Sequence, residues 1–227
     1  MPPVEHGSRL SNEEIALLRQ WIQEGARFQT HWAFVKPTRP RLPAATAWSD
    51  QPIDRFVRQR AAHLNLPASP PADPARLIRR LALDLTGLPP TREMVDAYVT
   101  DPSEATYGRI VNQLLADPAY GEHWASMWLD LARYADTMGY AGDETRSIWP
   151  WRDWLIQSLN ENMPFDQFTL ELLAGDILPN ATTDQKLATA FHRNTLNNNE
   201  GGTNNEEVRT IAVKDRINTT INTWMGL

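Results

Sequence analysis

Apolar residues recur at intervals of three and four over most of the chain, the spacing that places side chains on one face of a helix. The first such segment begins with Ser11-Asn12-Glu13-Glu14, a capping box in which the serine hydroxyl accepts a backbone N–H while Glu14 reaches back to the cap. Gly25 is placed to end the segment. The pattern predicts a short amphipathic helix, followed by a proline-bearing extended connector over residues 36–48.

The helical pattern resumes beyond residue 50 with clear start and stop signals. Asp73-Pro74 supplies an N-cap and a proline at the first helical position, and Gly87 followed by Pro89-Pro90 ends the segment. Further helices are predicted over residues 91–100, 103–116, 118–135, 164–174, 182–193 and 204–225. Alternation typical of strands is nowhere sustained, so we expect an all-α fold, a multi-helix domain with long loops.

Three of the predicted helical segments carry faces of large apolar side chains that we expect to be buried. The members are Trp124, Trp128, Leu131 and Tyr134 in the first, Trp151, Trp154, Leu155 and Leu159 in the second, and Val213, Ile217, Ile221 and Trp224 in the last. Because a large aromatic ring beside leucines is good core material, most of the nine tryptophans are expected to be structural.

Composition and charge exclude several classes of function. With 22 basic and 28 acidic residues the net charge is −6, whereas a nucleic-acid-binding protein needs a basic face. No uncharged apolar run approaches the roughly 20 residues of a transmembrane segment, and no signal peptide opens the sequence. Cysteine is absent, so the chain cannot itself form disulfides, thiolate metal sites or covalent haem attachments.

The first thirty residues carry a resemblance to the end of a class I cytochrome c domain. It rests on Met1-Pro2-Pro3 and on the capped helix from Leu10 to Ile22. The resemblance implies that Met1 is an axial haem ligand in a longer parent protein, because a thioether suits haem iron. Residues 1–30 are therefore expected to be the C-terminal remnant of a cytochrome c domain with its short tail helix. The alternative is that Met1 is only an initiator methionine.

Residues 31–227 resemble the large uncharacterised domain that follows the cytochrome unit in planctomycete multidomain c-type cytochromes. The resemblance rests on several long phrases in the same order. They are His31-Trp32-Ala33-Phe34, Leu83-Asp84-Leu85-Thr86-Gly87-Leu88-Pro89-Pro90, the stretch from Trp128 to Asp136, Ala174-Gly175-Asp176, Asn199-Glu200-Gly201-Gly202, Glu206-Glu207-Val208-Arg209 and the stretch from Asp215 to Thr220.

In that family the stretch similar to Trp224-Met225-Gly226-Leu227 leads into a Cys-x-x-Cys-His haem-attachment motif, which this sequence does not contain. We therefore expect both ends to be cut from a longer protein. The resemblance implies a parent that is a periplasmic or otherwise exported c-type cytochrome containing haem c. Its expected partners are the haem-bearing parts of the same chain and a redox partner.

The most concentrated polar cluster lies near the C-terminus, on both sides of Gly201-Gly202. The residues singled out there are His192, Arg193, Asn194, Asn198, Glu200, Glu206, Arg209, Asp215 and Arg216. Carboxylates and amide oxygens on a glycine-bearing loop could bind a hard cation such as calcium, with Glu200 and Glu206 as ligands, or could hydrogen-bond a sugar. The alternative is an ordered structural loop whose asparagines cap the neighbouring helices.

A second set of charges includes Asp130, Arg133 and Asp136, spaced three apart on one predicted helix. Arg152-Asp153 and Asp215-Arg216 add further pairs of an acidic and a basic residue. Such sets can be catalytic, but they more often form networks between helices in which arginine grips carboxylates. No recognisable catalytic motif is present, so the sequence does not decide whether the chain is an enzyme.

The leading hypothesis is a scaffold segment of an exported c-type cytochrome that takes part in electron transfer or redox coupling. One alternative is a polysaccharide-binding or polysaccharide-acting module that uses residues 194–207. Another is an assembly domain without chemistry.

Overall fold

The computed structural model describes residues 10–140, 142–196, 198 and 204–226, and within them it is all-α. The described residues contain ten α-helices and no strand, only an isolated bridge between Thr137 and Thr145. No helix among them is both long and apolar enough to cross a membrane. The chain divides into two compact units, Met1–Pro70 and Pro71–Leu227. The sequence analysis places a domain boundary after residue 30, inside the first unit.

The first unit contains short helices, and none of its residues from 10 to 70 is buried. Its elements are α1 (Asn12–Gln23), the 3-10 helix η2 (Trp32–Phe34) and α2 (Pro52–His63). The capping box predicted at Ser11 is present: Ser11 Oγ accepts from the backbone N–H of Glu14, and Glu14 Oε2 accepts from that of Ser11. Neither α1 nor α2 has a buried residue, so the amphipathic faces of both helices are open in this unit.

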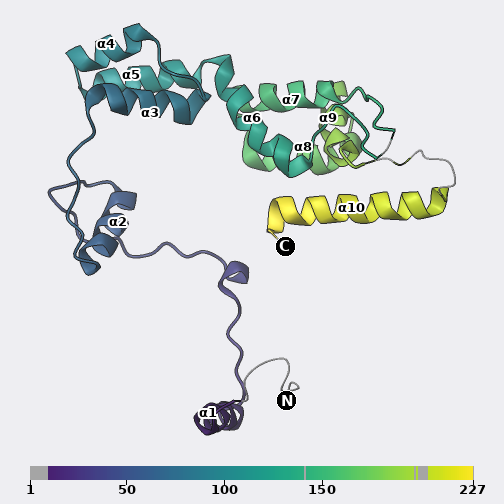
Figure 1. Cartoon of the computed structure of the whole chain (residues 1–227), viewed down its shortest axis with the longest axis horizontal. Coiled ribbons are helices and arrows are strands. Elements are labelled where there is room, and N and C mark those ends of the chain that lie inside the picture. Colours follow the sequence, from purple (N-terminus) through teal and green to yellow (C-terminus); the bar gives the residue numbers. More distant parts are fainter. Residues whose placement is uncertain (1–9, 141, 197, 199–203, 227) are drawn as a thin grey trace. The chain divides into compact units, whose positions relative to one another are not determined.

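The second unit contains eight α-helices, labelled in Figure 1. They are α3 (Pro74–Thr86), α4 (Arg92–Thr100), α5 (Glu104–Leu115), α6 (Pro118–Ala132), α7 (Trp149–Asn160), α8 (Phe165–Ala174), α9 (Thr183–Ala188) and α10 (Asn205–Met225), with the 3-10 helices η3 (Gly175–Ile177) and η4 (Thr189–Arg193). Most predicted ranges agree within two residues. Two differ: the helix expected over 118–135 ends at Ala132, and the one expected over 182–193 is α9 followed by η4.

One core cluster of the second unit lies between α3, α4 and α5. Its buried residues are Ile78, Ala82, Met94, Tyr98, Ile110 and Leu114. The start of α3 is fixed as the sequence predicts, because Asp73 accepts two backbone N–H groups ahead of Pro74. Its end is fixed by Gly87, which has a left-handed φ of 69° and lies so close to His123 on α6 that a side chain would collide.

A second core cluster lies between α6, α7, α8, α9 and η4, and four of its nine described buried residues are aromatic. Trp151 is fully buried, and its indole N–H donates to the Ala188 carbonyl at 3.0 Å. Its ring lies 6.2 Å from Phe191. Trp154 stacks on Phe168 at 5.7 Å, with 18° between the ring planes. The face of Trp151, Trp154 and Leu155 is therefore buried, as the sequence predicts.

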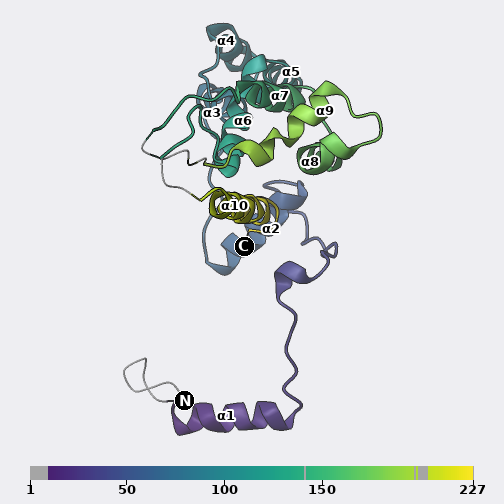
Figure 2. The ribbon, with the colours of Figure 1, turned by 90° about the vertical axis from the view of Figure 1, so that its right-hand side faces the viewer.

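The faces predicted for α6 and α10 are partly wrong. On α6 the buried positions are Gly121, Ala125 and Ala132, whereas Trp124 and Leu131 are exposed, because small residues let α7 approach closely. Figures 1 and 2 show α10 lying along one side of this group of helices.

On α10 only Thr219 is buried among the described positions. Val213 and Ile217 of its expected face are exposed, and Ile221 and Trp224 are half-buried. The helix turns the side with Ala212, Asp215 and Thr219 inward because a hydrogen-bond network fixes it there.

Candidate functional site

Some residues of the polar cluster expected near the C-terminus lie at a junction between the end of α6, the segment after η4 and the middle of α10. Arg133 is the C-cap of α6 and has the left-handed φ of 56°. Its guanidinium donates to Asp215 Oδ2 at 2.5 Å and to the Thr219 hydroxyl at 2.5 Å, both on α10. The Thr195 hydroxyl also donates to Asp215 Oδ2. One carboxylate therefore joins three segments that are far apart in the sequence.

The acidity of Asp215 follows from these contacts. The hydrogen bond from Arg133 holds the pKa of this carboxyl below its usual value, and the bond from Thr195 and the charges of Arg133 and Arg216 act in the same direction. Partial burial opposes them. Charge-assisted bonds of this kind are the stronger ones in proteins, so this pair is a structural joint for α10.

A second arginine, Arg146, ties the segment after η4 to the end of the α6 region. Its Nε donates to the Ala135 carbonyl at 3.0 Å, and its Nη1 donates to the carbonyls of Arg193 at 3.2 Å and Thr195 at 2.9 Å. Burial lowers the pKa of this guanidinium. A fourth backbone carbonyl, that of Asn194, also accepts from Arg146. The guanidinium thus supplies the hydrogen bonds that these carbonyls would otherwise receive from backbone N–H groups in regular secondary structure.

His192 and Arg216 line the same small cavity as Arg133, Thr195 and Asp215. The cavity has a volume of about 10 Å³, the space of one water molecule, so it does not hold a substrate. His192 is half-buried, and burial lowers its pKa, as does the charge of Arg216. A hydrogen bond to the Leu173 carbonyl acts the other way.

Asn194 is 2% exposed, and its amide N–H groups donate to the carbonyls of Ala190 and Phe191. Its Oδ1 is buried without a hydrogen-bond partner in the part of the chain that the structure describes. Arg193 is exposed and enters the junction through its carbonyl alone.

The remaining predicted site residues lie apart from this junction. Glu206 and Arg209 are exposed on α10 and pair with each other at 3.1 Å, so the Glu206 carboxylate already has a cationic partner. Asn198 is half-buried. Met1 and Glu200 lie outside the described residues. Within the described ranges no three His, Cys, Asp or Glu side chains are placed to hold a metal ion.

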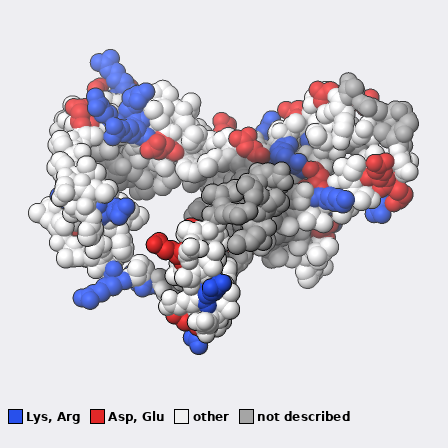
Figure 3. All heavy atoms as spheres, turned by 60° about the horizontal axis from the view of Figure 1, so that its bottom comes forward, with Lys and Arg blue, Asp and Glu red and all other residues white. Residues whose placement is uncertain are grey.

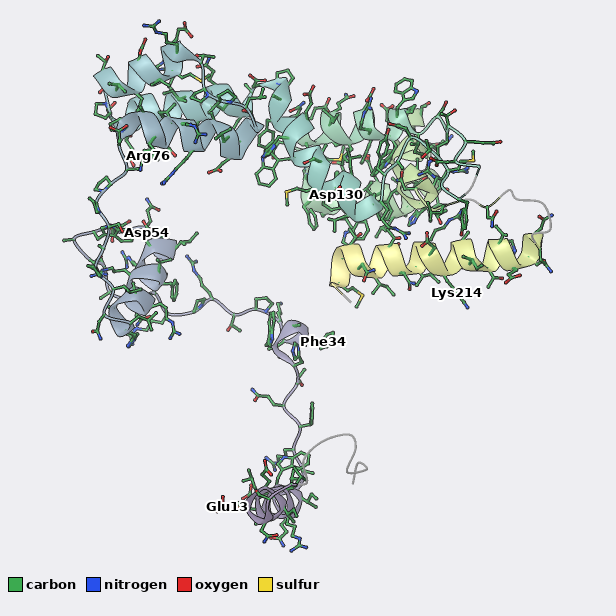
Figure 4. All side chains as sticks on the ribbon, viewed as in Figure 1. Glu13, Phe34, Asp54, Arg76, Asp130 and Lys214 are labelled. Atoms are coloured by element: carbon green, nitrogen blue, oxygen red, sulfur yellow. The ribbon has the colours of Figure 1, made fainter. Side chains whose placement is uncertain are left out.

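The charged triplet of the sequence analysis is not on one helix face. Asp130 lies on α6 and is labelled in Figure 4, whereas Arg133 caps that helix and Asp136 lies beyond it, because the helix ends three residues earlier than predicted. Asp136 accepts from the hydroxyl of Tyr134 at 2.6 Å. Burial first, and then this hydrogen bond, raise the pKa of Tyr134 to about 12.

Sequence reasoning missed Arg146, Thr195 and Thr219 as members of the junction. Arg146 lies outside the charged sets singled out by the sequence, and the other two are uncharged. Each acts over a long sequence separation: Thr195 bonds Asp215 across 20 positions, Arg146 bonds the Thr195 carbonyl across 49, and Thr219 bonds Arg133 across 86. Figure 3 shows basic and acidic side chains mixed over one face of the molecule, in keeping with the net charge of −6. The junction connects segments of the same chain and has the geometry of a structural contact between helices.

Comparison with known proteins adds the family. Residues 52–227 match the model of PSCyt2, described as a protein of unknown function (DUF1549), which covers well over half of the chain. The chain belongs to the PSCyt2 family. PSCyt2 domains occur in planctomycete proteins that contain cytochrome c, although no cytochrome c domain is detected in this chain itself. No curated protein and no solved structure matches the sequence.

The residues of this PSCyt2 chain do not fit covalent haem attachment. A c-type haem is held through cysteine thioethers, and the sequence contains no cysteine. The cysteines that attach a c-type haem are therefore not supplied by this sequence.

Proposed function

We propose that this PSCyt2 chain is the helical scaffold of an exported c-type cytochrome and that it serves electron transfer by holding a haem-bearing part of the same protein. The single observation that carries the proposal is membership of a family that occurs in cytochrome-c-containing proteins. Because the chain itself lacks cysteine, its contribution is to position the haem-bearing part and to exclude water around it.

The outer side of α10 supports this role. This 21-residue helix buries one residue, while Ile211, Val213 and Ile217 are 51%, 42% and 52% exposed and Met225 is 59% exposed. Several exposed large apolar side chains on one helix are typical of a surface that another protein part covers. Lys214 lies on the side of α10 turned away from the other helices (Figure 4).

The direct experiment uses the longer native protein, expressed in a bacterial host with cytochrome c maturation. We expect a Soret band that survives acid-acetone extraction, because covalently attached haem is not extracted. A native protein that purifies without covalent haem under these conditions would remove the proposal.

A matched pair of variants then tests the scaffold role of α10 in that haem-containing protein. Ile217→Glu places a charge among the exposed apolar side chains of α10, and Gln113→Glu adds the same charge at an exposed position on α5. We expect Ile217→Glu to shift the haem midpoint potential or to loosen the haem-bearing part in limited proteolysis. Gln113→Glu is expected to have a smaller effect, and equal effects of the two variants would show that α10 does not hold the haem-bearing part.

The other candidate functions stay hypotheses. The polysaccharide-binding loop at 194–207 includes residues 197 and 199–203, which lie outside the described ranges. Calcium binding by Glu200 and Glu206 also stays a prediction. Calorimetry with calcium on the wild type and on Glu206→Gln tests it, because a bound cation has to displace Arg209 from the Glu206 carboxylate.

A further inference from the structure

A second cavity, unrelated to the junction at Asp215, lies between α7, α8 and α9. It has a volume of about 150 Å³, enough for several water molecules or a small ligand. Its side chains are mostly polar, with the indole of Trp154 and the thioether of Met163 as its apolar part. The polar lining comprises Gln157, Ser158, Glu161, Glu171, Thr182, Asp184 and Gln185.

The carboxylate of Glu171 is the unusual feature of this cavity. Glu171 is 4% exposed, and a buried carboxylate is costly unless a cation or several donors satisfy it. It receives hydrogen bonds from the amides of Gln167 at 3.0 Å and Gln185 at 3.3 Å, and both end on Oε1. Neither of these bonds uses Oε2, so this oxygen is available to another donor. Glu171 itself lines the cavity.

The carboxylate is held in place by a fixed neighbour. Gln185 belongs to the capping box of α9, in which its Oε1 accepts from the backbone N–H of Thr182 at 3.1 Å. The same side chain therefore turns its N–H toward Glu171. Because the donor is fixed by a helix cap, the orientation of Glu171 does not have to be organised when a ligand arrives.

The charge around the cavity is of one sign. Glu161, Glu171 and Asp184 line it, and its lining contains no lysine, arginine or histidine. Lys186, next to the lining residue Gln185 in the sequence, is exposed and does not line the cavity. Trp154 also lines the cavity, with one face of its ring stacked on Phe168, and aromatic rings attract cations.

We propose that this cavity binds a primary ammonium group, either of a small free amine or of a lysine side chain. The ammonium group donates one hydrogen bond to Glu171 Oε2, and its alkyl part lies against Trp154 and Met163. A neutral sugar hydroxyl would leave the buried Glu171 carboxylate without a counter-charge, whereas Glu161 and Asp184 are exposed. This site is independent of the proposed cytochrome function, since it needs no haem, and the two can fail separately.

The test uses the whole chain and follows backbone amide and indole N–H shifts by NMR during titration with propylammonium chloride. Propanol has nearly the same shape without the charge, and sodium chloride matches the ionic strength. We expect saturable shifts at Trp154, Ser158 and Gln185 with propylammonium and none that saturate with the other two. Titration with Nα-acetyl-lysine methylamide separates the two sources, because only a cavity open to a side chain on a peptide gives the same shifts.

Two conservative variants decide the role of the carboxylate. Glu171→Gln keeps the shape of the side chain and is expected to weaken binding roughly tenfold or more, since hydrogen bonds to charged groups are worth that much. Glu122→Gln makes the same chemical change at an exposed position on α6 and is expected to leave binding unchanged. Asp184→Asn, at the exposed edge of the cavity, keeps the test valid if Glu171→Gln does not fold, and it is expected to weaken binding severalfold. Equal shifts with propanol, or equal affinity in Glu171→Gln and the wild type, would overturn the proposal.

Discussion

Replacement of Trp151 by phenylalanine tests whether the aromatic cluster between α6, α7, α8 and α9 stabilises the second unit. The Trp151 side chain is fully buried, stacks on Tyr134 at 6.2 Å and donates its indole N–H to the Ala188 carbonyl at 3.0 Å. Phenylalanine retains one ring but cannot donate this hydrogen bond. The substitution also leaves a cavity where the larger indole was.

The magnitude follows from these two losses. A buried carbonyl left without its donor costs about 1–3 kcal/mol, and the unfilled ring volume adds about 1 kcal/mol. The free energy of unfolding is therefore expected to fall by about 2–4 kcal/mol. With a urea m-value of about 1–3 kcal/mol per molar, the unfolding midpoint drops by roughly 1 M or more.

Trp149→Phe is the matched control, because Trp149 lies two residues away at the start of the same helix and is 52% exposed. The same chemical change there is expected to alter the free energy of unfolding by no more than about 0.5 kcal/mol. Urea unfolding followed by circular dichroism at 222 nm compares the two variants with the wild type. Equal midpoints for Trp151→Phe and Trp149→Phe would refute the role assigned to the buried indole.

Three further predictions concern the junction and the packing of α9. Asp215→Asn is expected to destabilise the chain at pH 7. The difference from wild type should begin to shrink as the pH falls below the ordinary carboxyl pKa of about 4 and should vanish only below the lowered folded pKa of Asp215, because the carboxyl loses its contribution as it is protonated in the folded state. A pH-independent difference in urea unfolding would contradict the ion pair with Arg133. Arg146→Lys is expected to speed hydrogen exchange at residues 193–196, since lysine cannot bond four carbonyls. Arg152→Lys, whose hydrogen bonds within the described residues end on neighbouring Asp153, is expected to leave that exchange unchanged. Gly175→Ala is expected to lower the melting temperature, because its Cβ would lie 2.1 Å from the carbonyl oxygen of Gln185. Gly108→Ala in α5 meets no atom within 4 Å and should raise the free energy of unfolding by about 0.5–1 kcal/mol. A Gly175→Ala variant as stable as the wild type would show that α8 and α9 separate easily.

The helices could be predicted from the sequence because their signals are local. Ser11, Asp73 and Gly87 each act within a few residues of a helix end, and the structure shows each of them capping as predicted. The early end of α6 could not be predicted in this way. Residues 133–135 continue the helical pattern of apolar and polar residues, yet Arg133 leaves the helix to reach Asp215, eighty-two positions away.

The candidate site could be predicted only in part, for the same physical reason. Asp215, His192 and Arg216 drew attention by their chemical type, and the structure places all three around one cavity. Glu171 drew none, because a glutamate within an apolar helix such as α8 looks like an ordinary surface residue. Its burial depends on α9 packing over it, and Gly175 allows that approach, which only the fold reveals.

The attachment of α10 bears on its proposed role, because a scaffold must hold a partner without losing its own shape. The described contacts of α10 with the core include polar bonds from Arg133 to Asp215 and Thr219 and ring contacts from Trp224 to Phe191 at 5.2 Å and Trp128 at 6.0 Å. Asp215 and Thr219 lie one turn apart on one side of the helix, whereas Val213 and Ile217 lie on another side and are exposed. Trp224, two turns beyond Ile217, shares that second side and contacts the core only near the C-terminal end of the helix. An apolar helix face would normally turn inward, so the polar contacts fix a rotation that hydrophobicity alone would not choose. Without the Arg133 contact, α10 should be free to rotate and bury Ile217. We therefore predict that Arg133→Met weakens docking to the exposed apolar side chains of α10, even where the helix itself stays folded.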